Sequence, residues 1–131
     1  MADKAHKILI IDDEPAILST LAEFFLARGY AAATALDGDE GLKKFDSEGP
    51  DLVLCDIRMP NKDGFQFLKE VRAAKRWVPI IIISALTDPS SMLKGYDFKA
   101  DYYLTKPLDL NETLKAVEIM LSLAPLRKDE T

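Results

Sequence analysis

Acidic side chains follow two short apolar segments of this chain of 131 residues. Asp12 and Asp13 come directly after Lys7–Ile11, and Asp56 comes directly after Leu52–Cys55. Short apolar runs are typical of strands buried on both faces, and in open parallel sheets the ligand crevice lies outside the carboxyl ends of the strands. We therefore expect the three carboxylates to converge at that edge. Because their like charges repel, the arrangement favours a bound divalent cation, and a few oxygen ligands completed by water suit Mg²⁺.

A hydroxyl and an ammonium group are expected at the same edge. Ser84 ends the β-branched run that starts at Val78, and Lys106 follows a short run that ends at Leu104. Transfer of a phosphoryl group depends mainly on positioning and on neutralising charge, so it needs metal-holding carboxylates, a hydroxyl and a Lys. An aspartate can act as the nucleophile and form an aspartyl phosphate. The set therefore indicates phosphoryl chemistry on an aspartate.

Five apolar segments alternate with five amphipathic ones, and this pattern predicts a parallel α/β sheet covered by helices on both faces. Right-handed crossovers restrict the topology to a doubly wound sheet. In such a sheet of the flavodoxin-like strand order 2-1-3-4-5, the first and third strands lie side by side at the switch point. We expect strands over Lys7–Ile11, Tyr30–Leu36, Leu52–Cys55, Val78–Ile83 and Ala100–Leu104. We expect five helices, over Pro15–Leu26, Asp39–Ser47, Phe65–Lys75, Asp88–Phe98 and Leu110–Leu123, the last of them ended by Pro125.

Charge and composition argue against several classes of function. Seventeen basic and 22 acidic residues give a net charge of −5, and the basic residues are scattered, so we expect no direct binding of nucleic acid by this chain. No apolar run approaches the roughly 18 residues of a membrane span. The single cysteine, Cys55, cannot form an internal disulfide. These features predict a cytoplasmic protein that is not bound to a membrane.

The residues at the ends of the apolar segments closely resemble those of the receiver domain of two-component response regulators. The resemblance extends over residues 7 to about 123 and depends on the whole set of motifs rather than on any one of them. The motifs are Asp12-Asp13, Asp56 followed by Met59-Pro60, Asp63-Gly64, Ser84-Ala85 and Lys106-Pro107. The resemblance implies phosphorelay signal transduction by a chain with the fold described above.

The resemblance implies that Asp56 accepts a phosphoryl group from a histidine kinase, a histidine phosphotransfer protein or a small phosphodonor. Asp13 and Asp56 would hold Mg²⁺ together with the backbone carbonyl of Arg58, and Mn²⁺ is an alternative metal. Asp12 would act on the metal through water. Lys106 would pair with the phosphate.

A conformational switch is also implied by the resemblance. Ser84 and Ala85 would contact the phosphate, Ser84 would move toward it, and Tyr103 would swing inward behind Ser84. The Lys106–Pro107 peptide bond would be cis and would aim the Lys side chain. This would be a two-state switch, in which the charge added by the phosphoryl group shifts a packed part of the fold from one conformation to the other.

The interaction surface implied by the resemblance is made by Asp88–Phe98, Ala100–Leu104 and Leu110–Leu123. It would contact a downstream protein target, an output domain or a second copy of the chain in a phosphorylation-dependent homodimer. The chain would be no enzyme beyond catalysing its own phosphorylation and dephosphorylation. Residues 7–124 are expected to form the receiver domain, between an N-terminal tail of residues 1–6 and a C-terminal tail or linker of residues 125–131.

Three other classes of protein were weighed against this interpretation. A flavin-binding module of the same fold needs a hydroxyl or Gly-rich loop after the first strand, whereas Asp12, Asp13 and Glu14 repel a phosphate there. A phosphatase of the haloacid dehalogenase type needs Asp-x-Asp at that place and a cap domain. A receiver-like interaction module that is never phosphorylated need not retain the complete acidic and basic set that this sequence carries.

Overall fold

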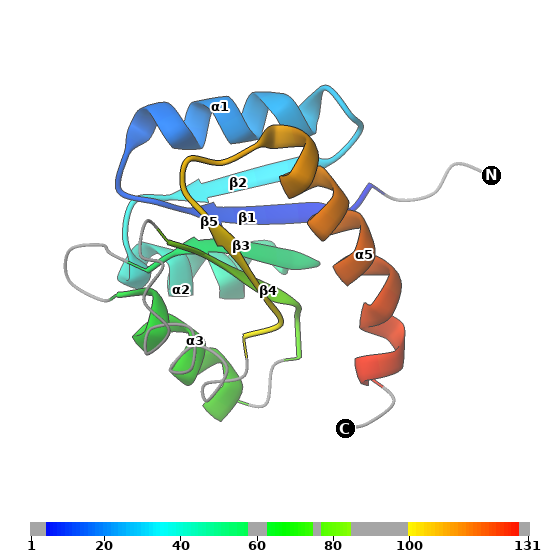
Figure 1. The fold of residues 1–131 in the computed structure, drawn as a ribbon. Coiled ribbons are helices and arrows are strands. Elements are labelled where there is room, and N and C mark those ends of the chain that lie inside the picture. The colour runs from blue at the N-terminus through cyan, green and yellow to red at the C-terminus, as the bar shows by residue number, and fades with distance from the viewer. Residues whose placement is uncertain (1–4, 58–62, 75–76, 85–99, 129–131) are drawn as a thin grey trace.

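The apolar segments of the sequence form five parallel strands in one sheet (Figure 1). The structure is a computed structural model that describes residues 5–57, 63–74, 77–84 and 100–128, with the backbone alone for residues 125–128. The strands are β1 (Lys7–Ile11), β2 (Ala31–Ala35), β3 (Leu52–Asp56), β4 (Ile80–Ser84) and β5 (Tyr102–Thr105). Their order is β2-β1-β3-β4-β5, so the predicted order is confirmed.

Helices cover both faces of this sheet. In the described residues they are α1 (Pro15–Leu26), α2 (Gly38–Glu48), α3 (Gly64–Ala73) and α5 (Leu110–Lys128). Figure 1 shows α2 and α3 on one side of the sheet, and α1 and α5 contribute to the core on the other side. The helix predicted over Asp88–Phe98 lies outside the described residues.

Each central strand carries a continuous apolar run of four residues because both of its faces are covered. In β1, Leu9 and Ile11 pack in the core beneath α2 and α3, while Ile8 and Ile10 pack in the core beneath α1 and α5. All four side chains are fully buried. Strands that are buried on both faces lose the alternation of apolar and polar residues, so the sequence shows continuous runs there.

Aspartates set the first residue of three helices. The carboxylates of Asp37, Asp63 and Asp109 each accept a hydrogen bond from the backbone N–H three residues further on, at 2.8, 2.8 and 3.0 Å. Such N-caps satisfy donors that have no partner within the helix. They place the starts of α2 and α3 at Gly38 and Gly64, one residue before the predicted positions.

The prediction that Pro125 ends the last helix is wrong, because α5 continues to Lys128. A proline removes one N–H donor and crowds the preceding turn, which weakens a helix without excluding it, and the residues that follow favour the helical state. None of the helices in the described ranges, α5 included, has both the length and the apolarity to cross a membrane.

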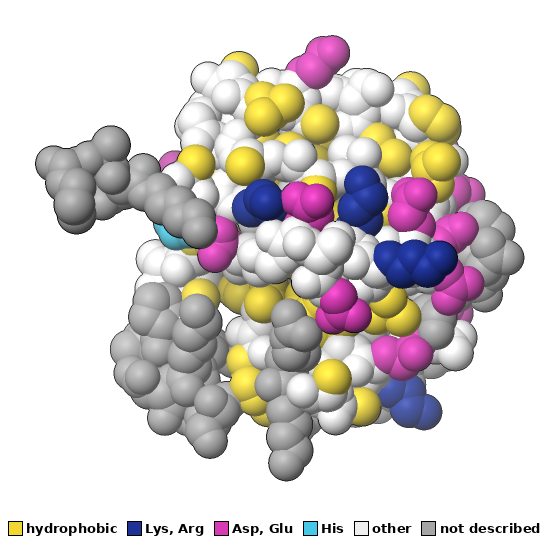
Figure 2. Space-filling view, turned by 180° about the vertical axis from the view of Figure 1, so that it is seen from behind, with side chains coloured by type: hydrophobic (Ala, Val, Ile, Leu, Met, Phe, Trp, Pro, Cys, Tyr) yellow, Lys and Arg dark blue, Asp and Glu magenta, His cyan; other side chains and the backbone are white. Residues whose placement is uncertain are grey.

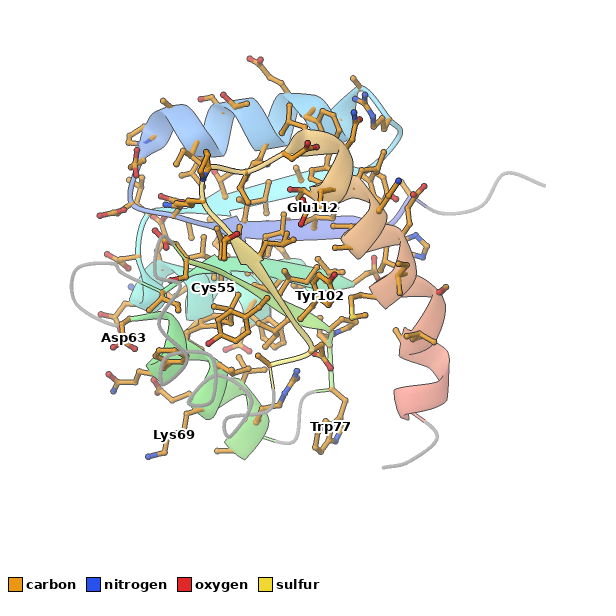
Figure 3. The ribbon with its side chains drawn as sticks, in the orientation of Figure 1. Cys55, Asp63, Lys69, Trp77, Tyr102 and Glu112 are labelled. Carbon is orange, nitrogen blue, oxygen red and sulfur yellow. The ribbon has the colours of Figure 1, made fainter. Side chains whose placement is uncertain are left out.

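A buried ion pair that the sequence did not reveal joins α3 to the amino ends of β4 and β5. Arg72 Nη2 lies 2.7 Å from Asp101 Oδ2, and less than a tenth of either side chain is exposed. Asp101 also accepts the backbone N–H of Ile80 at 2.8 Å, and Arg72 donates to the carbonyl of Val78 at 2.9 Å. Trp77, which Figure 3 shows just beyond α3, lies with its ring centre 5.6 Å from the guanidinium carbon of Arg72. These contacts explain why β4 begins at Ile80 and not at Val78.

We expect Arg72→Met to lower the free energy of unfolding by about 3 kcal/mol, because the carboxylate of Asp101 would stay buried without its counter-ion. Urea unfolding followed by circular dichroism measures this change. Lys69→Met, which removes an exposed positive charge from the same helix, is the matched control and should change the stability by less than about 0.5 kcal/mol. Equal effects of the two substitutions would contradict the role assigned to the ion pair.

Candidate functional site

Three carboxylates meet at the carboxyl ends of β1 and β3. The two strands are parallel neighbours with Ile11 opposite Cys55, so Asp12 and Asp56 follow at the same level. One oxygen from each of Asp12, Asp13 and Asp56 lies within 4.8 Å of the others. Asp12 and Asp56 are 1% and 5% exposed, whereas Asp13 is exposed. The structure therefore brings together the acidic residues that the sequence placed at this edge.

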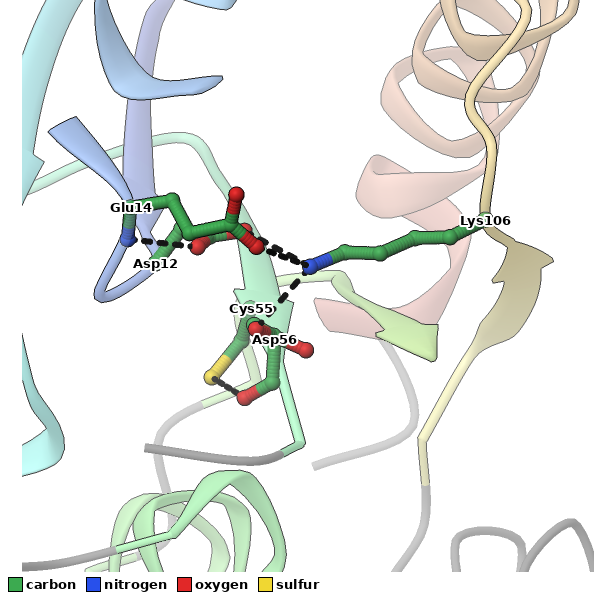
Figure 4. Close-up of polar contacts among 5 residues, drawn as sticks. All are labelled: Asp12, Glu14, Cys55, Asp56 and Lys106. Atoms are coloured by element: carbon green, nitrogen blue, oxygen red, sulfur yellow. Dashed lines mark hydrogen bonds and ion pairs between the residues drawn. The ribbon is translucent and has the colours of Figure 1, made fainter. Parts of the chain in front are cut away.

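Lys106 reaches the same place from the end of β5, as Figure 4 shows. Its Nζ lies 3.2 Å from Asp56 Oδ2 and 3.3 Å from Asp12 Oδ2. Its backbone N–H donates to the carbonyl of Ser84 at 2.8 Å, and the Lys106–Pro107 peptide bond is cis. The ammonium group thus bridges the two buried carboxylates.

Burial and charge shift the pKa values of these groups. Burial raises the pKa of Asp12 above its ordinary value; the hydrogen bond from the Glu14 N–H opposes this shift, and the negative charge of Asp56 adds to it. Burial by itself lowers the pKa of Lys106, but the carboxylates of Asp56 and Asp12 outweigh it and the net shift is upward. Lys106 is therefore positively charged, and ionisation of Asp12 is less favourable in the folded protein than in water.

The donor set fits a divalent cation. Asp12 Oδ2 is buried and, among the described residues, makes no hydrogen bond, although it forms the ion pair with Lys106. Three carboxylates against one ammonium leave an excess of negative charge in a partly buried place. A hard cation with oxygen ligands satisfies both the charge and the buried lone pairs of Asp12.

The other predicted site residues lie around this centre. Ser84 is buried at the end of β4, opposite Thr105 of β5. Tyr103 is partly buried and packs on the core beneath α2 and α3, while its neighbour Tyr102 is 40% exposed. Arg58 and Ala85, predicted to contact the metal and the phosphate, lie outside the described residues.

The sequence assigned no role in the site to Glu14, and Cys55 lies beside the site as a core residue. Glu14 Oε1 lies 3.7 Å from Lys106 Nζ, so a third acidic side chain faces the ammonium group. Its position in the loop directly after Asp13 was a usable signal. The thiol of Cys55 donates to the backbone carbonyl of Asp56 at 3.4 Å (Figure 4). Burial, and then the nearby charge of Asp56, raises the pKa of this thiol well above its ordinary value, so Cys55 is a neutral core residue.

The charges on the surface are mixed. Figure 2 shows Lys and Arg side chains interspersed with Asp and Glu across one face of the molecule. The positive charge on that face is therefore not gathered into a single patch.

The strand order and the position of the site at the carboxyl edge define a flavodoxin-like α/β domain. The family model of the response regulator receiver domain matches residues 8–118. The chain therefore belongs to the family of receiver domains of two-component response regulators, whose signalling is based on phosphorylation.

Curated relatives and solved structures agree with this assignment. The chain is 38% identical to the transcriptional regulatory protein RprY of Bacteroides fragilis, over 91% of this chain and 50% of that protein. It is 37% identical to the alkaline phosphatase synthesis transcriptional regulatory protein PhoP of Bacillus subtilis, over 95% of this chain and 55% of that protein. The chain thus spans about half the length of these curated relatives.

Two solved structures of receiver domains are also similar. The receiver domain of the Francisella response regulator 1452 has a TM-score of 0.85 and 32% identity, over 89% of this chain and 97% of that one. The CheY-like receiver domain protein of Methanospirillum hungatei has a TM-score of 0.88 and 25% identity, over 98% of this chain and all of that one.

We expect Asp12→Asn to stabilise the protein at neutral pH when divalent cations are chelated. Since the pKa of Asp12 is raised by folding, the folded state holds more protons than the unfolded state between the ordinary and the raised value, and the stability falls as the pH rises through that window. The Asn variant has no carboxylate at this position, so its stability does not fall in that pH window for this reason. Urea unfolding with a chelator, at neutral pH and below the ordinary Asp pKa of about 3.9, should show an advantage for Asn only at neutral pH. Glu23→Gln, an exposed change on α1, is the control; a neutral-pH effect as large as that of Asp12→Asn would contradict the interpretation.

Proposed function

We propose that Asp56 is the phosphoacceptor of this receiver domain and that Asp12, Asp13 and Asp56 hold the Mg²⁺ that the transfer needs. One observation carries the proposal: Asp56 belongs to the three carboxylates within 4.8 Å of one another and also lies 3.2 Å from Lys106 Nζ. The carboxylate that receives the phosphoryl group therefore has cation-binding oxygens on one side and an ammonium group on the other.

The transfer follows from the chemistry of these groups. A carboxylate oxygen of Asp56 attacks the phosphorus atom of a phosphohistidine or an acyl phosphate, and the bond from phosphorus to the donor breaks with its electron pair going to the donor. Asp12, Asp13 and Asp56 would hold the cation, which when bound would neutralise charge on the transferred oxygens. Lys106 exchanges its contact with Asp56 for one with a phosphoryl oxygen, and the Ser84 hydroxyl donates to another. The proposed set also includes the backbone carbonyl of Arg58, which would be a metal ligand, and Ala85, which would contact the phosphate; both residues lie outside the described ranges. Water then hydrolyses the aspartyl phosphate, so the chain catalyses only its own phosphorylation and dephosphorylation.

The partner that supplies the phosphoryl group is a histidine kinase or a histidine phosphotransfer protein. A groove beside the site supports this part of the proposal. Its polar end is made by Glu14 and Lys106, and the rest is mainly apolar, lined by Ala16, Ile17, Leu21, Pro107, Leu108 and Leu110. A helix carrying a phosphohistidine can bury apolar side chains there while its phosphate approaches Asp56.

The output part of the proposal concerns Ser84 and Tyr103. Ser84 moves toward the phosphoryl group and Tyr103 moves inward behind it, so the change reaches β5, the helix proposed for Asp88–Phe98 and α5. This surface binds a downstream target or an output domain. The proposed domain begins at residue 7, after an N-terminal tail of residues 1–6, and acts in the cytoplasm. Its predicted end at residue 124 moves to the end of α5 at Lys128.

We expect acetyl phosphate with Mg²⁺ to add one phosphoryl group to the chain, at Asp56. Intact-mass spectrometry detects the addition, and Mn²⁺ should replace Mg²⁺. Asp56→Asn should keep the circular dichroism spectrum of the folded protein and gain no mass. Asp39→Asn, an exposed change on α2, is the matched control and should be labelled like the unchanged protein.

Two results would contradict this assignment. Labelling of the Asp56→Asn variant would show that another residue accepts the phosphoryl group. If the unchanged chain gained no mass although it bound Mg²⁺, the alternative of a receiver-like interaction module that is not phosphorylated would hold.

We also propose that phosphorylation drives the chain into a homodimer through β5 and α5. Tyr102 on the edge strand β5 and Ile119 and Leu123 on α5 are large apolar side chains that are 40 to 53% exposed. A twofold interface would bring each of these patches against its copy, because a symmetric dimer uses the same surface on both chains.

We expect the phosphorylated protein to sediment as a dimer and the unphosphorylated protein as a monomer. Ile119→Glu should keep the phosphorylated protein monomeric, because it places like charges at the interface. Leu26→Glu changes a side chain of similar exposure on α1 and should leave the dimer intact. Analytical ultracentrifugation distinguishes these outcomes, and a dimer that survives Ile119→Glu would exclude this surface.

A further inference from the structure

The first turn of α3 lies directly on the backbone of Asp56. The N–H of Gly64 donates to the carbonyl of Ile57 at 2.9 Å, which brings the helix start against the end of β3. A Cβ atom on Gly64 would collide with the carbonyl oxygen of Asp56 and would lie 2.9 Å from the Cα of Ile57. Both of these are backbone atoms, so no side-chain rotation relieves the overlap.

Position 64 requires glycine for a steric reason and not for a conformational one. Among the described residues the glycines with positive φ are Gly29 and Gly49, and Gly64 is not one of them. An alanine could therefore adopt the backbone conformation of Gly64, and only the contact with β3 excludes it.

Neither side of this contact can easily move away. On the strand side, Ile57 is 5% exposed and its N–H donates to Ile83 of β4 at 3.1 Å. On the helix side, Phe65 and Phe67 are buried in the core. Figure 3 shows Asp63, the N-cap of α3, close to the end of the strand that carries Cys55. Adding a Cβ atom would therefore displace well-packed elements, and Asp56 is the residue nearest the collision.

We propose that Gly64 is a positioning residue for the cation site. Because it lacks a side chain, α3 can pack against the backbone of Asp56. This contact holds the Asp56 carboxylate where it can bind the same cation as Asp12 and Asp13. This inference rests on the function proposed above. Mg²⁺ demands nearly ideal octahedral geometry with short bonds, so a shift of Asp56 by a few tenths of an ångström weakens binding. Residues that orient metal ligands typically change metal affinity by about 10- to 100-fold when they are replaced.

Gly41 provides a matched control from the same fold. It lies in α2, and a Cβ atom there would be 2.6 Å from the Cδ1 of Ile11. That atom is the end of a flexible side chain, which can rotate away. Gly41→Ala therefore adds the same methyl group at a tight helix–sheet contact without pressing on the backbone of a proposed ligand.

The test is the affinity for Mg²⁺ alone, measured by isothermal titration calorimetry without any phosphodonor. We expect Gly64→Ala to raise the dissociation constant about 10-fold and Gly41→Ala to leave it within about twofold of the unchanged protein. Urea unfolding in chelator reports how much each substitution costs the fold itself. If Gly64→Ala lowers the stability and leaves the Mg²⁺ affinity unchanged, the glycine is only structural and the inference is overturned.

A second pair of variants covers the case in which Gly64→Ala does not fold. Phe65→Leu loosens the first turn of α3 near Asp56, and Val71→Ala loosens the core beneath its last turn. The inference requires weaker Mg²⁺ binding for Phe65→Leu than for Val71→Ala, and equal affinities would overturn it. If the unchanged protein bound no Mg²⁺, the proposed function itself would fail, so the two failures are distinguishable.

Discussion

The repulsion among the carboxylates of Asp12, Asp13 and Asp56 is the constraint around which this structure is arranged. Parallel pairing of β1 with β3 brings the residues after Ile11 and Cys55 to one level, so the charges cannot be kept apart without changing the strand order. Burial of Asp12 and Asp56 strengthens the repulsion because less water screens it. Lys106 offsets part of this charge, and the remainder is compatible with a bound divalent cation.

The rest of the fold holds these groups where they would not stay unaided. Side chains buried on both faces of the sheet hold β1, β3 and β4 in place. Charged groups are buried at both the amino and the carboxyl ends of the strands, but their charges balance at only one of these ends. At the amino ends of β4 and β5, Arg72 and Asp101 form a balanced ion pair with hydrogen bonds to the backbone. At the carboxyl ends the charges are unbalanced. The balanced end joins α3 to the sheet, whereas the unbalanced end has an excess of negative charge that the proposed cation would offset.

The same backbone contacts link the site to its surroundings. Cys55 and Gly64 both touch the main chain of Asp56, and the backbone of Lys106 is bonded to that of Ser84. The backbone of Asp56 is therefore in direct contact with α3, and the backbone of Lys106 with the end of β4. Relatives such as RprY and PhoP are about twice as long as the matched segment, so in those proteins the receiver fold is one part of a larger chain.

The sequence by itself determined the parallel α/β class, the edge on which the polar residues gather and the identity of the acidic cluster, because continuous apolar runs and the residues that end them depend on local periodicity. The strand order was predicted from the resemblance of these motifs to those of receiver domains. The starts of α2 and α3 were missed by one residue, since only the hydrogen bonds that Asp37 and Asp63 accept from the backbone show which residue is the cap. Tertiary structure alone decided the pairing of Arg72 with Asp101 and the reason for a glycine at position 64. Each of these depends on distances between segments far apart in the chain or across a turn, and no pattern of neighbouring residues encodes such a distance.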